Sequence, residues 1–200
     1  SVNRLDDEEL VELIHRSGGH FIFMGLESVD PVSLKSARKS FNKPADYGRI
    51  LHRLAEVNVY TITSFIVGLE DDRPGTAALI DAELAKWPPV LPVFGLLTPY
   101  AGTPLYDKLA AEGRLLNPTH WLGTKAFKAT FQFTHFSPDE AEEEVRDAWR
   151  RSYRPRVFAR SQRWLVANGK PFDAQVLFLV ARLIFRGIYF TSATQQGALI

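Results

Sequence analysis

The sequence predicts an α/β protein in which three parallel β/α units are followed by a mostly helical region. Three short, nearly continuous apolar runs, at residues 20–26, 59–68 and 90–97, are typical of strands buried on both faces of a parallel sheet. A helical pattern follows each run, which is the order expected of right-handed crossovers. From Arg114 onward only helices are predicted. We therefore place a boundary near residue 113, between a β/α part (1–113) and a helical extension (114–200).

Capping residues and apolar spacing predict the helices of the β/α part. Acidic residues 6–9 open a first helix, which Gly18 and Gly19 end. Asp30 and Pro31 form an N-cap and first-turn pair for a helix through about Ser40. The remaining helices are expected at residues 44–56, 74–86 and 103–113.

The helical extension begins with a long connection at residues 115–136. Ser137 and Glu140 then form a capping box around Pro138, and helices are predicted at residues 155–167 and 173–189. The charge run at 139–156 indicates a solvated helix with internal pairs such as Glu142–Arg146 and Asp147–Arg151. The last helix has two interpretations, of which we favour the first: it packs across the β/α part, or it lies on a membrane surface with its arginines outward.

Composition excludes several classes of function. The 200 residues carry 24 Lys+Arg and 23 Asp+Glu, and this balance argues against a nucleic-acid binder with a broad basic face. The chain has no cysteine, which excludes disulfides, thiol nucleophiles and an iron–sulfur cluster held by this chain alone. With no visible signal peptide, this composition fits a cytoplasmic protein. The chain starts at Ser1 and its only methionine is Met24, so we expect either a trimmed initiator or a piece of a longer protein.

Candidate binding residues follow the three strands, because ligands of parallel β/α sheets bind beyond the carboxyl ends of the strands. Glu27 and Ser28 follow the first strand, Gly68 and Glu70 the second, and Thr98 the third. Taken singly, each residue is equally well explained as an ordinary polar loop or turn position. The sequence has no phosphate loop, no GxGxxG and no GxSxG, and its five histidines show no metal spacing. A β/α-barrel hydrolase that uses Glu27 and Glu70 as paired carboxylates is one alternative.

Three motifs in order carry a family resemblance: FIFMGLES ending at Ser28, TSFIVGLEDD ending at Asp72, and FGLLTPYAGTPLYDKLAAEGRLL ending at Leu116. Together they resemble the second half of radical S-adenosylmethionine (radical SAM) enzymes, especially the cobalamin-binding subgroup. The resemblance implies half of a radical-SAM-type partial TIM barrel that binds S-adenosylmethionine across its open top. By position, Glu27 and Ser28 would contact its ribose or methionyl part, Ile66 and Gly68 would flank the adenine, and Leu96 to Thr98 would close over it. None of these residues performs electron transfer, so no catalytic and no metal-binding residue is assigned.

The sequence departs from the family in what it lacks: the cluster-binding cysteines, the first three strands and the cobalamin domain. The resemblance therefore implies a fragment that is inactive alone, with the 4Fe–4S cluster and cobalamin belonging to the full-length enzyme. Its partners would be the N-terminal half of that enzyme and a small, lipid-like substrate. A half barrel would also expose Phe21, Phe23, Ile62 and Phe65 unless the helical extension covers them. A third hypothesis is a non-enzymatic module that binds a membrane or a partner through residues 173–190.

Overall fold

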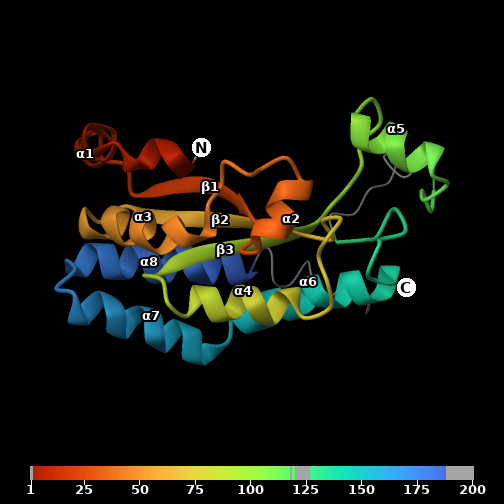
Figure 1. The fold of residues 1–200 in the computed structure, drawn as a ribbon. Helices are drawn as coiled ribbons and strands as arrows, with labels where there is room; N and C mark the ends of the chain where they lie inside the picture. Colours follow the sequence, from red (N-terminus) through yellow and green to blue (C-terminus); the bar gives the residue numbers. More distant parts are fainter. Residues whose placement is uncertain (1, 118, 120–126, 188–200) are drawn as a thin grey trace.

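Three parallel strands form the centre of the molecule (Figure 1). The structure is a computed structural model that describes residues 2–117, 119 and 127–187. Strands β1 (Phe21–Glu27), β2 (Tyr60–Val67) and β3 (Val90–Leu96) lie in the order β1-β2-β3, and both pairs are parallel. The predicted α/β class with three parallel strands is therefore confirmed.

Two helices, α2 and α6, begin where their caps predict, and α1 begins within the predicted acidic residues 6–9. Asp7 accepts hydrogen bonds from the backbone N–H groups of Glu9 and Leu10, Asp30 caps the next helix in the same way, and Ser137 and Glu140 form a complete capping box. The helices are η1 (Val2–Asp6, 3-10), α1 (Glu8–Arg16), α2 (Pro31–Ser36), α3 (Pro44–Glu56), α4 (Thr76–Leu84), α5 (Pro104–Ala111), α6 (Pro138–Ser152), α7 (Pro155–Ala167) and α8 (Phe172–Phe185).

Of the helix bounds that differ from the prediction, two are set by a residue with positive φ. Helix α2 ends at Ser36 and not near Ser40, because Arg38 takes a left-handed φ of 56° and the N–H of Lys39 returns to the carbonyl of Leu34. Helix α4 starts at Thr76 and not at Pro74, because Gly75 has a φ of 99° and cannot continue a helix backward. In both places a residue with positive φ sets the helix end.

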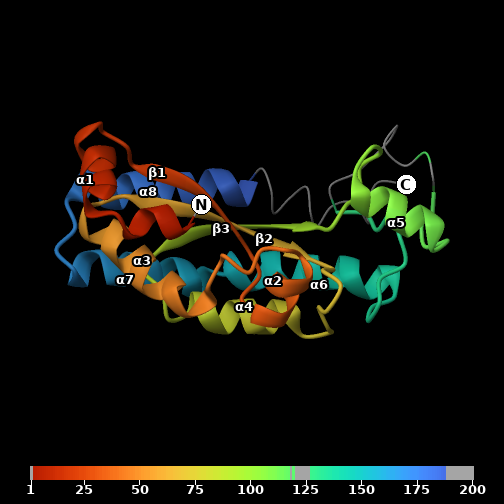
Figure 2. The same cartoon turned by 45° about the horizontal axis from the view of Figure 1, so that its top comes forward.

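The two faces of the sheet are covered differently (Figure 2). Helices α3, α4 and α6 lie on one side of the strands and α8 lies on the other. Toward the first side, Thr61, Thr63, Phe65 and Val67 of β2 are all buried, and the Phe65 ring stacks 5.6 Å from that of Phe94. This side holds most of the apolar core.

We call the opposite side the inner face. It carries the alternate residues of each strand: Phe21, Phe23 and Gly25 of β1; Tyr60, Ile62, Ser64 and Ile66 of β2; Leu91, Val93 and Gly95 of β3. Helix α8 covers the amino-terminal part of this face, where the Phe178 ring lies 5.3 Å from Tyr60. Of the residues expected to be exposed, Phe65 is buried, Phe21 and Ile62 are half-buried against α8, and Phe23 is 65% exposed. The helical extension thus covers the inner face only in part.

Helix α6 of the extension is fastened to β3. The indole N–H of Trp149 donates to the carbonyl of Phe94 at 3.1 Å, and the Tyr153 hydroxyl donates to that of Pro92 at 2.9 Å. The predicted Glu142–Arg146 and Asp147–Arg151 pairs are present on this helix. Its description as a solvated helix was wrong for one face, which is buried against β3 and α4 because every third or fourth residue is apolar. The division near residue 113 stays a proposal about chain organisation.

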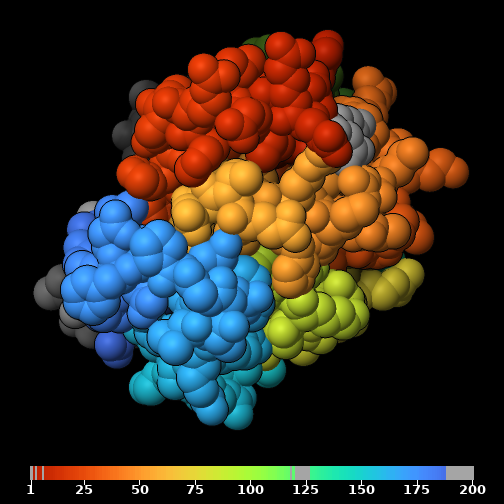
Figure 3. Space-filling view, turned by 90° about the vertical axis from the view of Figure 1, so that its left-hand side faces the viewer, coloured from red at the N-terminus to blue at the C-terminus, as the bar shows by residue number. Residues whose placement is uncertain are grey.

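Helices α7 and α8 lie beside α3 at the amino-terminal end of the strands (Figure 3). Arg182 of α8 points into the protein, is 2% exposed, and donates to the carbonyls of Val90 and Ser152. The last helix therefore packs on the β/α part, as the favoured interpretation predicted; residues 188–190 of the proposed membrane segment lie outside the described residues. No helix within the described ranges has the length and apolarity needed to cross a membrane.

Candidate functional site

A β-bulge ends β1 at the carboxyl edge of the sheet. The pairing with β2 shifts register between Gly25 and Glu27, and Glu27 has a φ of 67°, which is uncommon and strained for a residue other than glycine. Buried side chains hold this conformation. Asn42 donates to the carbonyls of Gly25 and Leu26, at 3.1 and 3.2 Å, and the Tyr47 hydroxyl donates to that of Leu26 at 3.0 Å. The strained position of Glu27 is thus fixed by its surroundings.

The bulge turns the Glu27 carboxylate over the inner face. A Cβ built on Gly25 would lie only 2.7 Å from Glu27 Oε1, so this orientation requires glycine at position 25. The Glu27 side chain is 16% exposed, and its Oε1 lies 3.7 Å from Nζ of Lys39. The carboxylate is therefore a partly buried acceptor at the edge of the inner face.

Beside Glu27 the inner face is nearly free of bulky side chains. We call the half-buried residues Gly25, Ser64, Ile66, Val93 and Gly95 the inner-face patch. No atom of the described chain lies within 4 Å of a Cβ built on Gly95. Gly95 therefore leaves the backbone of β3 open to close approach by a ligand, whereas the Glu27 carboxylate lies over Gly25.

Two of the predicted site residues have a structural task. The hydroxyl of Ser28, which is 2% exposed, accepts a hydrogen bond from the N–H of Asp30 at 3.0 Å and so shapes the turn into α2. Gly68 has a φ of 93°, and a Cβ there would lie 2.3 Å from the ring of Phe133. The positive φ and the nearby Phe133 ring therefore explain why position 68 is glycine. Cofactor contacts of Ser28 and Gly68 stay predictions.

Leu96 and Thr98 lie at the end of β3. The Leu96 side chain is 7% exposed and belongs to the core on the side away from the inner face, and the Thr98 hydroxyl donates to the Leu96 carbonyl at 3.2 Å. Ile66 is the predicted residue that lies within the inner-face patch. The predicted contacts of Leu96 and Thr98 with a cofactor are not tested by this geometry.

The sequence analysis missed Asp72, a buried carboxylate that ties the strand ends together. Asp72 Oδ2 accepts hydrogen bonds from the N–H groups of Gly68 and Leu69, and its Oδ1 accepts one from the Ser33 hydroxyl at 2.6 Å. Burial raises the pKa of this carboxyl, against the opposing effect of these hydrogen bonds. The sequence carries one signal for this role, because Asp72 comes four residues after Gly68, the glycine that follows β2.

Glu70 lies in an exposed ion-pair cluster. Its carboxylate accepts hydrogen bonds from Thr134, Arg114 and Lys108, and these, with Thr134 first, lower its pKa. Ion pairs with Lys108 and Arg114 engage the Glu70 carboxylate, so its surroundings give no support to a hydrolase that pairs Glu27 with Glu70. Within the described residues, no three His, Asp or Glu side chains are arranged to hold a metal ion.

Comparisons with known proteins find relatives that are named for the transfer of a methyl group. No protein-family model matches the chain. The chain is 32% identical over 109 residues to the bacteriochlorophyllide d C-12(1)-methyltransferase of Chlorobaculum tepidum, which covers 54% of this chain and 24% of that protein. It is 24% identical over 160 residues to the hopanoid C-2 methylase of Rhodopseudomonas palustris (80% and 29%), and 23% identical over 139 residues to the bacteriochlorophyllide d C-8(2)-methyltransferase of Chlorobaculum tepidum (69% and 31%).

The chain thus spans about a quarter to a third of the length of these relatives. All three are named for the transfer of a methyl group, so the chain is similar in sequence to one portion of methyltransferases.

Proposed function

We propose that this chain is the C-terminal portion of a cobalamin-type radical SAM methyltransferase, and that the inner-face patch with Glu27 holds S-adenosylmethionine. The observation that carries the proposal is the inner-face patch, which contains two glycines and lies at the carboxyl ends of three parallel strands. The carboxylate of Glu27, whose backbone is strained, lies beside it. The three strand-end motifs and the methyltransferase relatives support it.

The residues of the patch fit an adenosyl group. A planar adenine needs an apolar wall and close approach to backbone, which Ile66 and Gly95 would offer. The Glu27 carboxylate would accept hydrogen bonds from the ribose hydroxyls or the methionyl ammonium. Thr98 and the backbone of residues 96–97 would border the ligand at the end of β3, because the buried Leu96 side chain points to the other side of the sheet. Ser28 and Gly68 would contribute by shaping the backbone around the ligand. When bound, S-adenosylmethionine supplies the reactive methyl and adenosyl groups.

An iron–sulfur cluster does not fit this chain, because the sequence contains no cysteine to ligate it. In this proposal the cluster and cobalamin are held by the preceding half of the same enzyme, and the chain alone performs no radical chemistry. The exposed Phe23 on edge strand β1 would be covered by that half.

One observation favours a second candidate function, a module that docks on a membrane through residues 173–190 and so reaches a lipid-like substrate. Helix α8 exposes an apolar stripe made of Val176, Leu177, Val180, Leu183 and Ile184, at helical spacing. Co-sedimentation with liposomes tests it: Leu183→Glu should abolish membrane binding. Equal sedimentation of the variant, or none of the wild type, would count against docking.

Isothermal titration with S-adenosylmethionine tests the main proposal. We expect Gly95→Leu to abolish binding while leaving the melting temperature nearly unchanged, because its side chain would enter open space on the inner face. Glu27→Gln should weaken binding about tenfold or more, as expected for loss of a charge-assisted hydrogen bond. Glu12→Gln, on the exposed side of α1, is the matched control. Equal binding by Gly95→Leu, or no binding by the wild-type chain at millimolar ligand, would contradict the proposal.

A further inference from the structure

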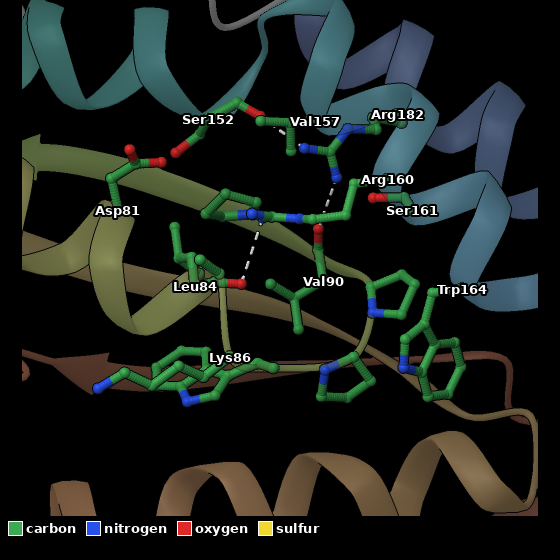
Figure 4. Close-up of a pocket in the computed structure, with 15 residues that line it drawn as sticks. Asp81, Leu84, Lys86, Val90, Ser152, Val157, Arg160, Ser161, Trp164 and Arg182 are labelled. Carbon is green, nitrogen blue, oxygen red and sulfur yellow. Dashed lines mark hydrogen bonds between the residues drawn. The ribbon is translucent and has the colours of Figure 1, made fainter.

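A cavity of about 160 Å³ lies at the opposite end of the sheet from the inner-face patch (Figure 4). It is lined by the end of α4, residues 85–89, the start of β3, and helices α7 and α8. Its inner wall includes the buried residues Val90, Ser152 and Arg182, whereas Lys86 is exposed and Arg160 and Trp164 are half-buried at its outer side. The cavity can therefore be reached from solvent.

Arg182 brings a buried positive charge to this cavity. Its Nη1 and Nη2 donate to the carbonyls of Val90 and Ser152, at 2.9 and 2.5 Å, but its Nε has no hydrogen-bond partner among the described residues. The guanidinium carbon lies 5.1 Å from the ring centre of Tyr153 and 5.0 Å from that of Phe158. Rings and carbonyls stabilise the cation only in part, because no described carboxylate forms an ion pair with it.

Arg160 adds a second guanidinium to the same cavity. It reaches across from α7, and its Nη2 makes only a long contact of 3.4 Å with the carbonyl of Leu84. The carboxylate that lines the cavity, Asp81, is already paired with Arg154 at 2.9 Å. Burial lowers the pKa of Arg160, and it lowers that of Arg182 to about 10, so Arg182 remains a cation at neutral pH. The cavity therefore carries an excess of positive charge.

We propose that this cavity binds a phosphate group, either free or at the head of a larger ligand, between the guanidinium groups of Arg160 and Arg182. A planar guanidinium suits phosphate oxygens, and an anion would compensate the buried Arg182 and the half-buried Arg160. The volume equals that of about five water molecules, which leaves room for a phosphate. Trp87, Trp164 and the adjacent prolines provide an apolar wall for the rest of a ligand.

The site is tested by titrating the full chain with inorganic phosphate at constant ionic strength, followed by calorimetry and indole fluorescence. Arg160→Gln should weaken phosphate binding about tenfold or more, and Arg160→Lys should restore part of it. The matched control is Arg156→Gln, an exposed arginine of the same helix that does not line the cavity. This control should bind like the wild type.

Two outcomes would overturn the proposal: no binding of millimolar phosphate by the wild-type chain, or equal weakening by Arg160→Gln and Arg156→Gln, which would show only general charge attraction. The source of the phosphate is distinguished by vesicles that contain phosphatidic acid and by vesicles of phosphatidylcholine alone. Sedimentation with the first kind that Arg160→Gln abolishes assigns the site to a lipid headgroup. Binding of free phosphate without sedimentation assigns it to a water-soluble ligand.

Discussion

Replacing Gly68 with alanine tests whether position 68 must be glycine for packing reasons or for ligand binding. An alanine at a φ of 93° costs about 1–3 kcal/mol in backbone strain. Its Cβ would also lie 2.3 Å from Phe133 Cε1, and Phe133 cannot simply swing away, since it is 8% exposed and its ring centre lies 4.3 Å from that of Phe131. Such overpacking adds about 1–3 kcal/mol. We expect Gly68→Ala to lower the free energy of unfolding by about 2–6 kcal/mol.

Gly75 provides the matched control for this experiment. Its φ of 99° is nearly the same, but no described atom lies within 4 Å of a Cβ built there, so Gly75→Ala should cost only the backbone term. Both free energies are measured by urea unfolding, with the same slope required for each variant. Equal destabilisation by the two substitutions would show that Phe133 does not confine position 68 and would refute the packing explanation.

Two further substitutions test buried polar groups. Because burial raises the pKa of Asp72, its contribution to stability is fully present below the unfolded pKa of about 3.9 and is lost as pH rises through the folded pKa. The stability of the wild type relative to Asp72→Asn should therefore fall with rising pH in urea unfolding, and a constant difference would contradict this sign. Arg182→Lys keeps the charge but loses the forked guanidinium that donates to the carbonyls of both Val90 and Ser152. We therefore expect the free energy of unfolding, measured by heat or urea, to fall by about 1.5–3 kcal/mol. Arg163→Lys, at an exposed position on α7, is the control. Equal losses of unfolding free energy in the two variants would mean that the forked contact of Arg182 contributes nothing.

The sequence predicted the features whose causes are local. Helix starts at Asp30 and Ser137 were found because a cap and the N–H groups it satisfies lie within three residues. The strands were found because each is a short run of mostly apolar and β-branched residues between helical patterns. These signals do not depend on the rest of the fold.

Features that depend on distant partners were not predicted. The task of Asp72 requires Ser33 across the strand ends, and the conformation of Glu27 requires Asn42 and Tyr47. Likewise, the spacing of the arginines in α8 could not show that Arg182 points inward, because its partners are carbonyls of β3 and α6. In each case the local sequence is compatible with more than one role for the residue, and tertiary packing decides which role it takes.

The central claim is that the inner-face patch receives an adenosyl group. The most direct measurement is a titration of the ¹⁵N-labelled chain with S-adenosylmethionine, followed by amide chemical shifts in NMR spectra. Our account predicts that the shifts concentrate on Gly25, Glu27, Ile66 and Gly95. Shifts confined to the Arg160 cavity, or no shifts at all, would contradict it.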